Sequence, residues 1–159
     1  MAMAKAIFDA IEFQDIEALE NHLENDASPI VANEEGIRPL TLVADLIKKS
    51  FDERMYEQEE MYKRMAAMLI VHGAPEKDLL HQCGEVSNLC HSLCRYIVDR
   101  SIALQNSLRV IDLIEAKRLW FNEDDKEMEK AFIHAIQTGD KNRVDEMFDK
   151  DQVHYAYEQ

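Results

Sequence analysis

The sequence has little glycine and proline, with four Gly and three Pro in 159 residues. All-β folds need many tight turns, so this scarcity favours helices. No apolar run approaches the roughly 18 residues of a transmembrane helix, and the first residues lack the apolar core of a secretory signal. Three cysteines, an odd number, suit a reducing compartment better than a disulfide framework. The sequence therefore predicts an all-α protein of the cytoplasm.

Basic residues are also scarce. The chain has 18 Lys and Arg and 32 Asp and Glu, which gives a net charge of −14. Nucleic acids and anionic membranes bind basic surfaces, so neither is an expected partner. The stretch from Asp9 to Asp26 holds seven acidic residues and no basic one. A protein with a basic patch is the natural complement, because opposite fields speed encounter. The alternative is that the acidity serves only solubility.

The sequence contains no G-x-x-x-x-G-K-[ST], G-x-G-x-x-G, G-x-S-x-G or H-E-x-x-H motif. We therefore expect no catalytic residue, cofactor, metal or small-molecule substrate. Cys83, Cys90 and Cys94 lie near His81 and His91. Spacings of seven and four place the three cysteines on one helical face, which favours a buried apolar role. Zinc binding and a Cys90–His91 nucleophile are the lesser alternatives. Neighbours in a helix point apart, which argues against the second.

Two segments of the chain resemble each other. Lys5 to Asp15 and Lys130 to Asp140 share Lys, Ala, Ala, Ile and Asp at identical offsets. Each is followed by a second amphipathic segment, Ile16 to Leu23 in one case and Arg143 to Phe148 in the other. Each block therefore predicts a helix, a tight turn and a second helix.

The segment Asn33 to Ala44 carries a turn followed by a helix start. Gly36 suits a positive φ in the turn, and Pro39 suits the first turn of a helix, where its missing N–H is not needed. The segment resembles the ankyrin-repeat pattern D-x-x-G-x-T-P-L-H-x-A-A, and Leu69 to Ala74 resembles the closing L-L-x-x-G-A of that repeat. Arg38 replaces the usual Thr of this pattern, and Thr41 replaces the usual His.

This ankyrin-like resemblance covers about residues 4–75 and 129–150. It implies a single all-α domain, residues 1–159, of stacked helix-turn-helix repeats. The expected parts are a first helical hairpin (4–29), the clearest repeat with a helical insertion (30–75), a diverged pair of long helices (76–121) and a C-terminal hairpin (126–150).

The clearest repeat is longer than the family pattern. Twenty residues separate Ala44 from Met65, where the pattern has about six. The extra stretch, Lys48 to Glu60, has no Gly or Pro. We therefore expect both helices of this repeat to be extended. Further along, Leu80 to Val98 and Ile102 to Leu119 predict two long helices.

The resemblance implies an adaptor-like module that binds another protein through turn tips, the concave face and extended helix tips. The candidate partner-binding residues are Ile30, Val31, Glu34, Glu35, Arg38, Thr41, Asp45, Phe51, Arg54, Met55, Tyr56 and Tyr62. Phe51 and Tyr62 have a competing role as bracing contacts between the longer helices. Trp120 and Phe121 form a further anchor candidate, with a helix-end core contact as the competing role.

Two other functions stay open at this point, besides a purely structural part of a larger assembly, against which the acidic ends of the chain argue weakly. One is an acidic inhibitor, resembling an antitoxin, that caps the active site of an enzyme. Ankyrin-like proteins include effectors of intracellular bacteria, so delivery into a host cell is compatible with the resemblance. The other is an unrecognised enzyme that uses the cysteine and histidine region.

Overall fold

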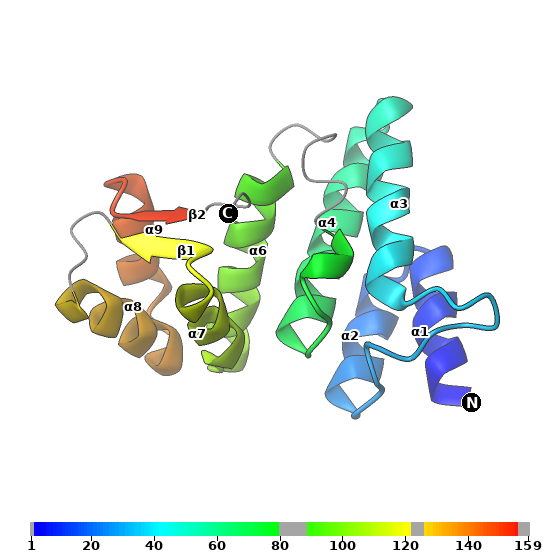
Figure 1. Ribbon diagram of the computed structural model, residues 1–159, viewed down its shortest axis with the longest axis horizontal. Coiled ribbons are helices and arrows are strands. Elements are labelled where there is room, and N and C mark those ends of the chain that lie inside the picture. The colour runs from blue at the N-terminus through cyan, green and yellow to red at the C-terminus, as the bar shows by residue number, and fades with distance from the viewer. Residues whose placement is uncertain (1, 80–88, 122–125, 156–159) are drawn as a thin grey trace. The chain divides into compact units, whose positions relative to one another are not determined.

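The computed structural model describes residues 2–79, 89–121 and 126–155 (Figure 1). Contacts divide the chain into two compact units, residues 1–93 (unit 1) and 94–159 (unit 2). The boundary falls within α6. The elements are α1 (Ala2–Glu12), α2 (Ile16–Glu24), α3 (Pro39–Asp52), α4 (Tyr56–Val71), α6 (Leu89–Leu104), α7 (Leu108–Glu115), β1 (Leu119–Phe121), α8 (Lys126–Thr138), α9 (Lys141–Asp149) and β2 (Val153–Tyr155). The described chain is therefore mostly helical, as predicted.

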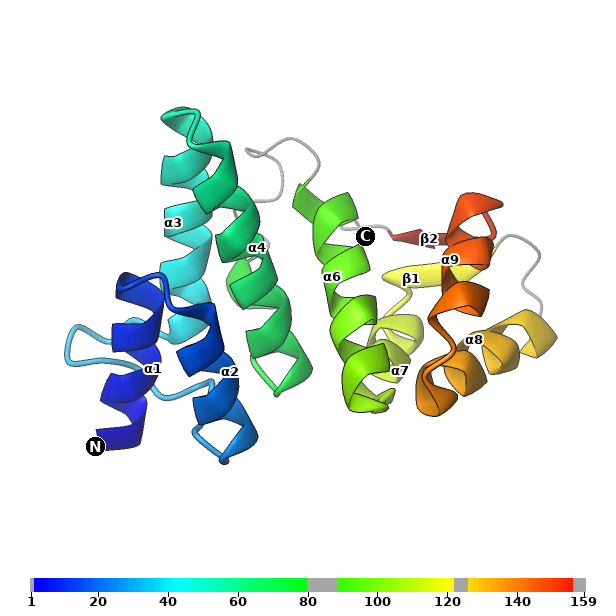
Figure 2. The ribbon, with the colours of Figure 1, turned by 180° about the vertical axis from the view of Figure 1, so that it is seen from behind.

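Unit 1 contains two helical hairpins, α1–α2 and α3–α4, and α2 packs beside α4 (Figure 2). Pro39 occupies the start of α3, as predicted. The expected helix extension is confirmed, because α3 continues to Asp52 and α4 begins at Tyr56 after a turn of residues 53–55. The turns of both hairpins lie at the same end of unit 1, and the α3–α4 turn reaches further (Figure 1).

Several helices end in the same backbone motif, which in this chain often forms without glycine. After α4 ends at Val71, Gly73 takes φ +119° and the Ala74 N–H donates to the Leu69 carbonyl at 2.9 Å. This is a Schellman cap, which normally requires glycine at the left-handed position. Other helix ends use the same pattern of hydrogen bonds with non-glycine residues at positive φ. These residues are Gln14, Asp26, Arg54, Gln105, Lys117 and Asp151.

The core of unit 1 is filled mainly by α3 and α4. Leu40 and Ile47 from α3 and Met65 and Leu69 from α4 are fully buried. The same helix α4 also buries an ion pair one turn apart, in which the Lys63 ammonium lies 2.7 Å from the Glu59 carboxylate. Both side chains are at most 7% exposed, so their charges need compensation, and the Lys63 ammonium also lies 3.4 Å from the Glu60 carboxylate.

The two similar sequence segments adopt the same local structure. Asp15 caps α2 by accepting a hydrogen bond from the Ala18 N–H at 3.0 Å, and Asp140 caps α9 through the Arg143 N–H at 3.1 Å. The N–H of each Asp in turn donates to the carbonyl of the shared alanine five residues earlier. Each block is therefore a helix, a tight turn and a capped second helix, as predicted.

Unit 2 departs from the predicted pair of long helices. The predicted helix Ile102–Leu119 is wrong, because α6 continues to Leu104, the chain turns at Gln105 (φ +51°), and α7 covers only eight residues. Much of the other predicted helix, Leu80–Val98, lies outside the described residues, and α6 accounts for its end. Apolar residues continue at helical spacing across this turn, and the turn contains no glycine. The sequence pattern therefore did not indicate that the helix ends there.

Two short strands complete unit 2. β1 and β2 pair antiparallel, with Trp120 opposite His154 and Phe121 opposite Val153. Phe121 and Val153 are buried, and Phe121 meets Phe132 of α8 edge-on at 5.5 Å between ring centroids. The sequence analysis did not predict these strands, because each holds only three residues.

Candidate functional site

The loop between α2 and α3 is held in one shape by Asn33. The Asn33 side-chain oxygen accepts hydrogen bonds from the N–H groups of Glu35 at 2.9 Å and Ile37 at 3.0 Å. The Asn33 N–H donates to the Ile37 carbonyl at 2.9 Å. Gly36 takes φ +79°, which a residue with a side chain rarely adopts. The loop is thus braced by Asn33.

This braced loop presents apolar and acidic side chains together. Ile30 is 49% exposed and Val31 is 43% exposed. Glu34 and Glu35 are exposed as well, and their carboxylates make no ion pair with the described residues. A loop that is already ordered before binding loses less conformational entropy when the complex forms. We call residues 28–37 the α2–α3 loop.

The predicted residues on α3 divide between structural and surface positions. The Arg38 guanidinium lies 2.7 Å from the Asp78 carboxylate and is engaged within unit 1. Thr41 is half-buried, whereas Asp45 is exposed. Arg38 keeps a side chain that is 40% exposed in spite of this ion pair.

The predicted residues around the α3–α4 turn also divide. Met55 is 41% exposed and Tyr56 is 60% exposed, and Arg54 is exposed in the turn. Phe51 is half-buried. Tyr62 is only 4% exposed and hydrogen-bonds with the Gln14 side chain. Burial raises the pKa of Tyr62 above 10.0, and this hydrogen bond lowers it by less. Tyr62 is therefore buried within unit 1.

The predicted residues do not form one continuous surface. The α2–α3 loop lies at the start of α3, and the α3–α4 turn lies at its end. Fourteen residues of helix separate the two, which corresponds to about 21 Å at 1.5 Å per residue. Two surfaces are thus available at opposite ends of unit 1 (Figure 1).

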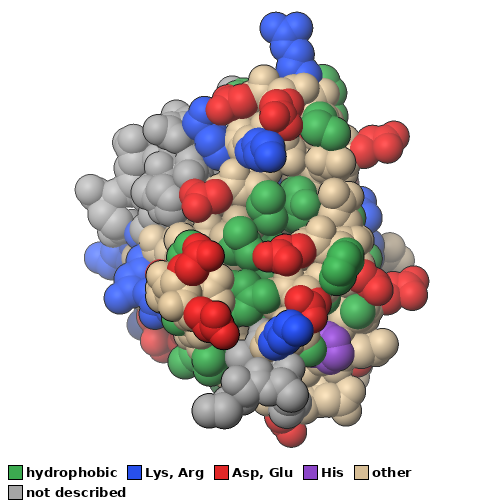
Figure 3. Space-filling view, turned by 90° about the vertical axis from the view of Figure 1, so that its right-hand side faces the viewer, with side chains coloured by type: hydrophobic (Ala, Val, Ile, Leu, Met, Phe, Trp, Pro, Cys, Tyr) green, Lys and Arg blue, Asp and Glu red, His purple; other side chains and the backbone are tan. Residues whose placement is uncertain are grey.

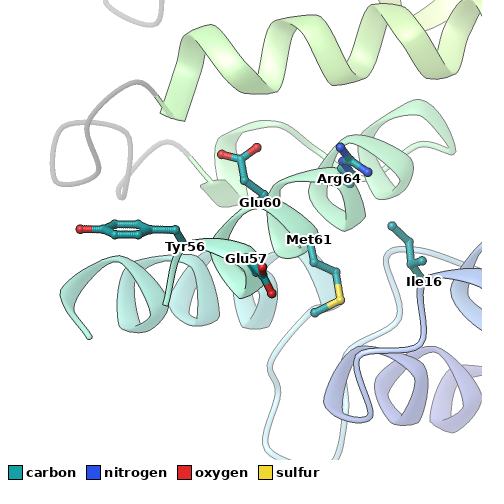
Figure 4. A pocket seen from close by; sticks show the side chains of 6 residues that line it. All are labelled: Ile16, Tyr56, Glu57, Glu60, Met61 and Arg64. Atoms are coloured by element: carbon teal, nitrogen blue, oxygen red, sulfur yellow. The ribbon is translucent and has the colours of Figure 1, made fainter. Parts of the chain in front are cut away.

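A groove between α2 and α4 lies beside the second of these surfaces. Its volume is about 430 Å³, and it is lined by Ile16, Tyr56, Glu57, Glu60, Met61 and Arg64. Figure 4 shows Tyr56 and Ile16 at opposite ends, with Met61 between them. Glu57 and Glu60 point to different sides of α4 in the same view.

Sequence reasoning found Tyr56 of this groove and missed the rest. A signal was present, because Tyr56, Glu60 and Arg64 repeat at four-residue spacing and Glu57 and Met61 do the same. The spacing identifies one face of α4. It does not show that α2 leaves that face open, which depends on how the two hairpins pack.

The charge of the chain is concentrated in unit 1. Residues 1–93 hold 18 acidic and 8 basic side chains, a net charge of −10, whereas residues 94–159 hold 14 and 10, a net charge of −4. Figure 3 shows acidic side chains surrounding hydrophobic ones on the side of unit 1 that carries α1 and α3. Unit 1 is therefore the stronger attractor of a basic partner.

The cysteine and histidine region is only partly described. Cys94 is 2% exposed, in agreement with the buried apolar role predicted for it. Cys83 and His81, and the side chains of Cys90 and His91, lie outside the described residues. Among the residues that the structure describes, three or more His, Cys, Asp or Glu side chains do not gather at any point where they could hold a metal ion.

The second anchor candidate lies on the two-stranded sheet of unit 2. Trp120 is 45% exposed and stacks on His154 with 4.3 Å between ring centroids, while Phe121 is buried. The predicted helix-end contact is therefore replaced by a cross-strand aromatic pair on the open face of the sheet. In the described residues, no helix is both long and apolar enough to cross a membrane.

Comparisons with protein-family models, with characterised proteins and with solved structures give no match to this chain.

Proposed function

We propose that this chain is a protein-interaction module whose partner carries a basic surface patch. The observation that carries the proposal is the α2–α3 loop, where Ile30 and Val31 are exposed next to the segment 33–37 that the Asn33 side chain braces. A single exposed apolar residue is ordinary, but two adjacent ones in a braced loop are typical of a contact surface. The resemblance of Asn33–Ala44 to an ankyrin repeat supports the same function.

The expected partner chemistry follows from the charges around the loop. Glu34 and Glu35 lie beside the two apolar residues, and unit 1 as a whole has a net charge of −10. Opposite charges across an interface steer association and exclude wrong partners. The apolar pair provides the desolvated contact, and the carboxylates select basic partners.

The test begins with capture of partners from a cell lysate on the immobilised chain, followed by titration calorimetry with each purified partner. The variant is Ile30→Ser combined with Val31→Ser. The matched control is Leu108→Ser in α7, which removes an apolar side chain that is 66% exposed in unit 2.

We expect the loop variant to weaken binding about tenfold or more, as for residues at the centre of an interface. The control should bind like the unchanged chain, and added salt should weaken binding by screening. Equal affinity of the loop variant and the unchanged chain for every partner would refute the proposal. If a partner is an enzyme, its activity in the complex distinguishes an adaptor from an inhibitor.

A further inference from the structure

We infer that the groove between α2 and α4 binds a short basic segment of a partner protein, with one apolar side chain seated in it. The inference rests on the proposed function and adds a second contact surface with its own chemistry. The groove lies near the α3–α4 turn, at the opposite end of α3 from the α2–α3 loop.

The residues that line the groove form an apolar part, called the apolar seat, and a charged border. Ile16 and Met61 are half-buried and lie next to each other along the groove (Figure 4). Tyr56 continues this surface with a ring that is 60% exposed. A volume of about 430 Å³ accommodates one large apolar side chain with room for the adjoining backbone. Tyr and Met are residue types that are enriched in interface cores.

The border of the groove attracts positive charge. Glu57 is exposed and makes no hydrogen bond or ion pair through its carboxylate with the described residues. Glu60 adds a second carboxylate, which is 46% exposed and 3.4 Å from the Lys63 ammonium. Arg64 is the one cationic side chain among the lining residues. Partner arginines or lysines would thus meet Glu57 first.

Acidic residues near the groove add to its negative electrostatic potential. α2, which contributes Ile16 to the lining, carries Glu17, Glu20 and Glu24 and no Lys or Arg. The net charge of −10 in unit 1 opposes nucleic acids and acidic peptides. An apolar seat with an acidic border therefore fits a cationic peptide segment around a Leu, Ile or Met side chain.

The experiment selects peptides from a phage-displayed random library on the full chain. Enriched sequences are synthesised with a fluorescent label, and their binding is measured by anisotropy. The groove variants are Met61→Ser and Glu57→Gln. The controls are Glu115→Gln, which removes one exposed carboxylate from unit 2, and the loop variant Ile30→Ser with Val31→Ser. Circular dichroism checks that each variant is folded.

We expect the enriched peptides to place Arg or Lys around one aliphatic residue. Met61→Ser should weaken their binding about tenfold, and Glu57→Gln should weaken it about threefold. Both controls should leave binding unchanged. Replacing the aliphatic residue of the peptide by Ser should abolish binding.

Other outcomes overturn the inference and are separable from failure of the proposed function. Peptides that are acidic or uncharged, peptides insensitive to both groove variants, or a failure to enrich any peptide would each remove the groove as a docking site. Peptides lost only in the loop variant would overturn the groove while supporting the α2–α3 loop. Partner capture that depends on the loop tests the proposed function independently of this groove.

Discussion

The Arg38 guanidinium donates a hydrogen bond to the Asp78 carboxylate at 2.7 Å, which ties the N-cap of α3 to the segment after α4. The Asp78 side chain is 7% exposed, and its other oxygen, Oδ2, is buried without a hydrogen-bond partner in the described structure. Asp78 therefore depends on Arg38 for compensation of its charge. The Arg38 side chain remains 40% exposed while it makes this contact.

Arg38→Met should lower the free energy of unfolding by about 1–3 kcal/mol, because it leaves a buried carboxylate unpaired. Urea denaturation followed by circular dichroism measures this loss. Arg38→Met combined with Asp78→Leu removes both charges and should lose less than Arg38→Met alone. A double variant that is less stable than the single one would show that the pair is not the source of the effect.

The two helix caps should contribute similar stabilities. Asp15→Ala and Asp140→Ala each remove a side-chain acceptor from a helix N-terminus, at 3.0 Å and 3.1 Å respectively. Each should lower the free energy of unfolding by about 1 kcal/mol. Asp→Ser at either position keeps an acceptor and should recover most of that loss. Equal stability of the Ala and Ser variants in urea titrations would contradict the cap assignment.

Lys117→Gly should raise the stability of the chain. Lys117 takes φ +60° after α7, where the Arg118 N–H donates to the Leu113 carbonyl at 2.9 Å. Glycine adopts this conformation without steric cost, so we expect a gain of about 0.5–1 kcal/mol. Lys117→Ala keeps the β-carbon and should bring no gain. Thermal unfolding, read from the fluorescence of Trp120 in unit 2, compares the two variants.

Tyr62 should make the chain less stable in alkaline solution. Its pKa is raised above 10.0 because its burial disfavours the phenolate. The folded chain therefore keeps the Tyr62 proton to a higher pH than the unfolded chain does. The contribution of this difference in pKa to the free energy of unfolding is complete below about pH 10. It is lost as the pH rises through the raised pKa of Tyr62.

Tyr62→Phe removes this titration and should make the fall in melting temperature above pH 10 shallower. Tyr56→Phe, which changes a tyrosine that is 60% exposed, is the matched control and should keep the original slope. Identical slopes for all three proteins, measured by circular dichroism, would show that Tyr62 does not titrate differently on folding.

Local sequence chemistry was sufficient for most helices of unit 1. Pro39 marked the start of α3, and Gly73 marked the end of α4. The absence of Gly and Pro from Lys48 to Glu60 indicated the longer helices correctly. Local reasoning missed the end of α6, because Gln105 takes a left-handed conformation that glycine usually provides. The strands escaped prediction since three residues give too little alternation to detect.

The candidate surfaces could be predicted only in part from the local sequence. The sequence by itself determined the helical class, the acidic charge and the apolar residues Ile30 and Val31 in a turn, because composition and short-range hydrogen bonding depend on neighbours in the chain. Only the tertiary structure decided that Arg38 joins Asp78 and that Tyr62 is buried. It alone also decided that α2 and α4 leave a groove beside Tyr56. Those outcomes depend on which helix faces meet, and residues distant in the sequence determine that packing.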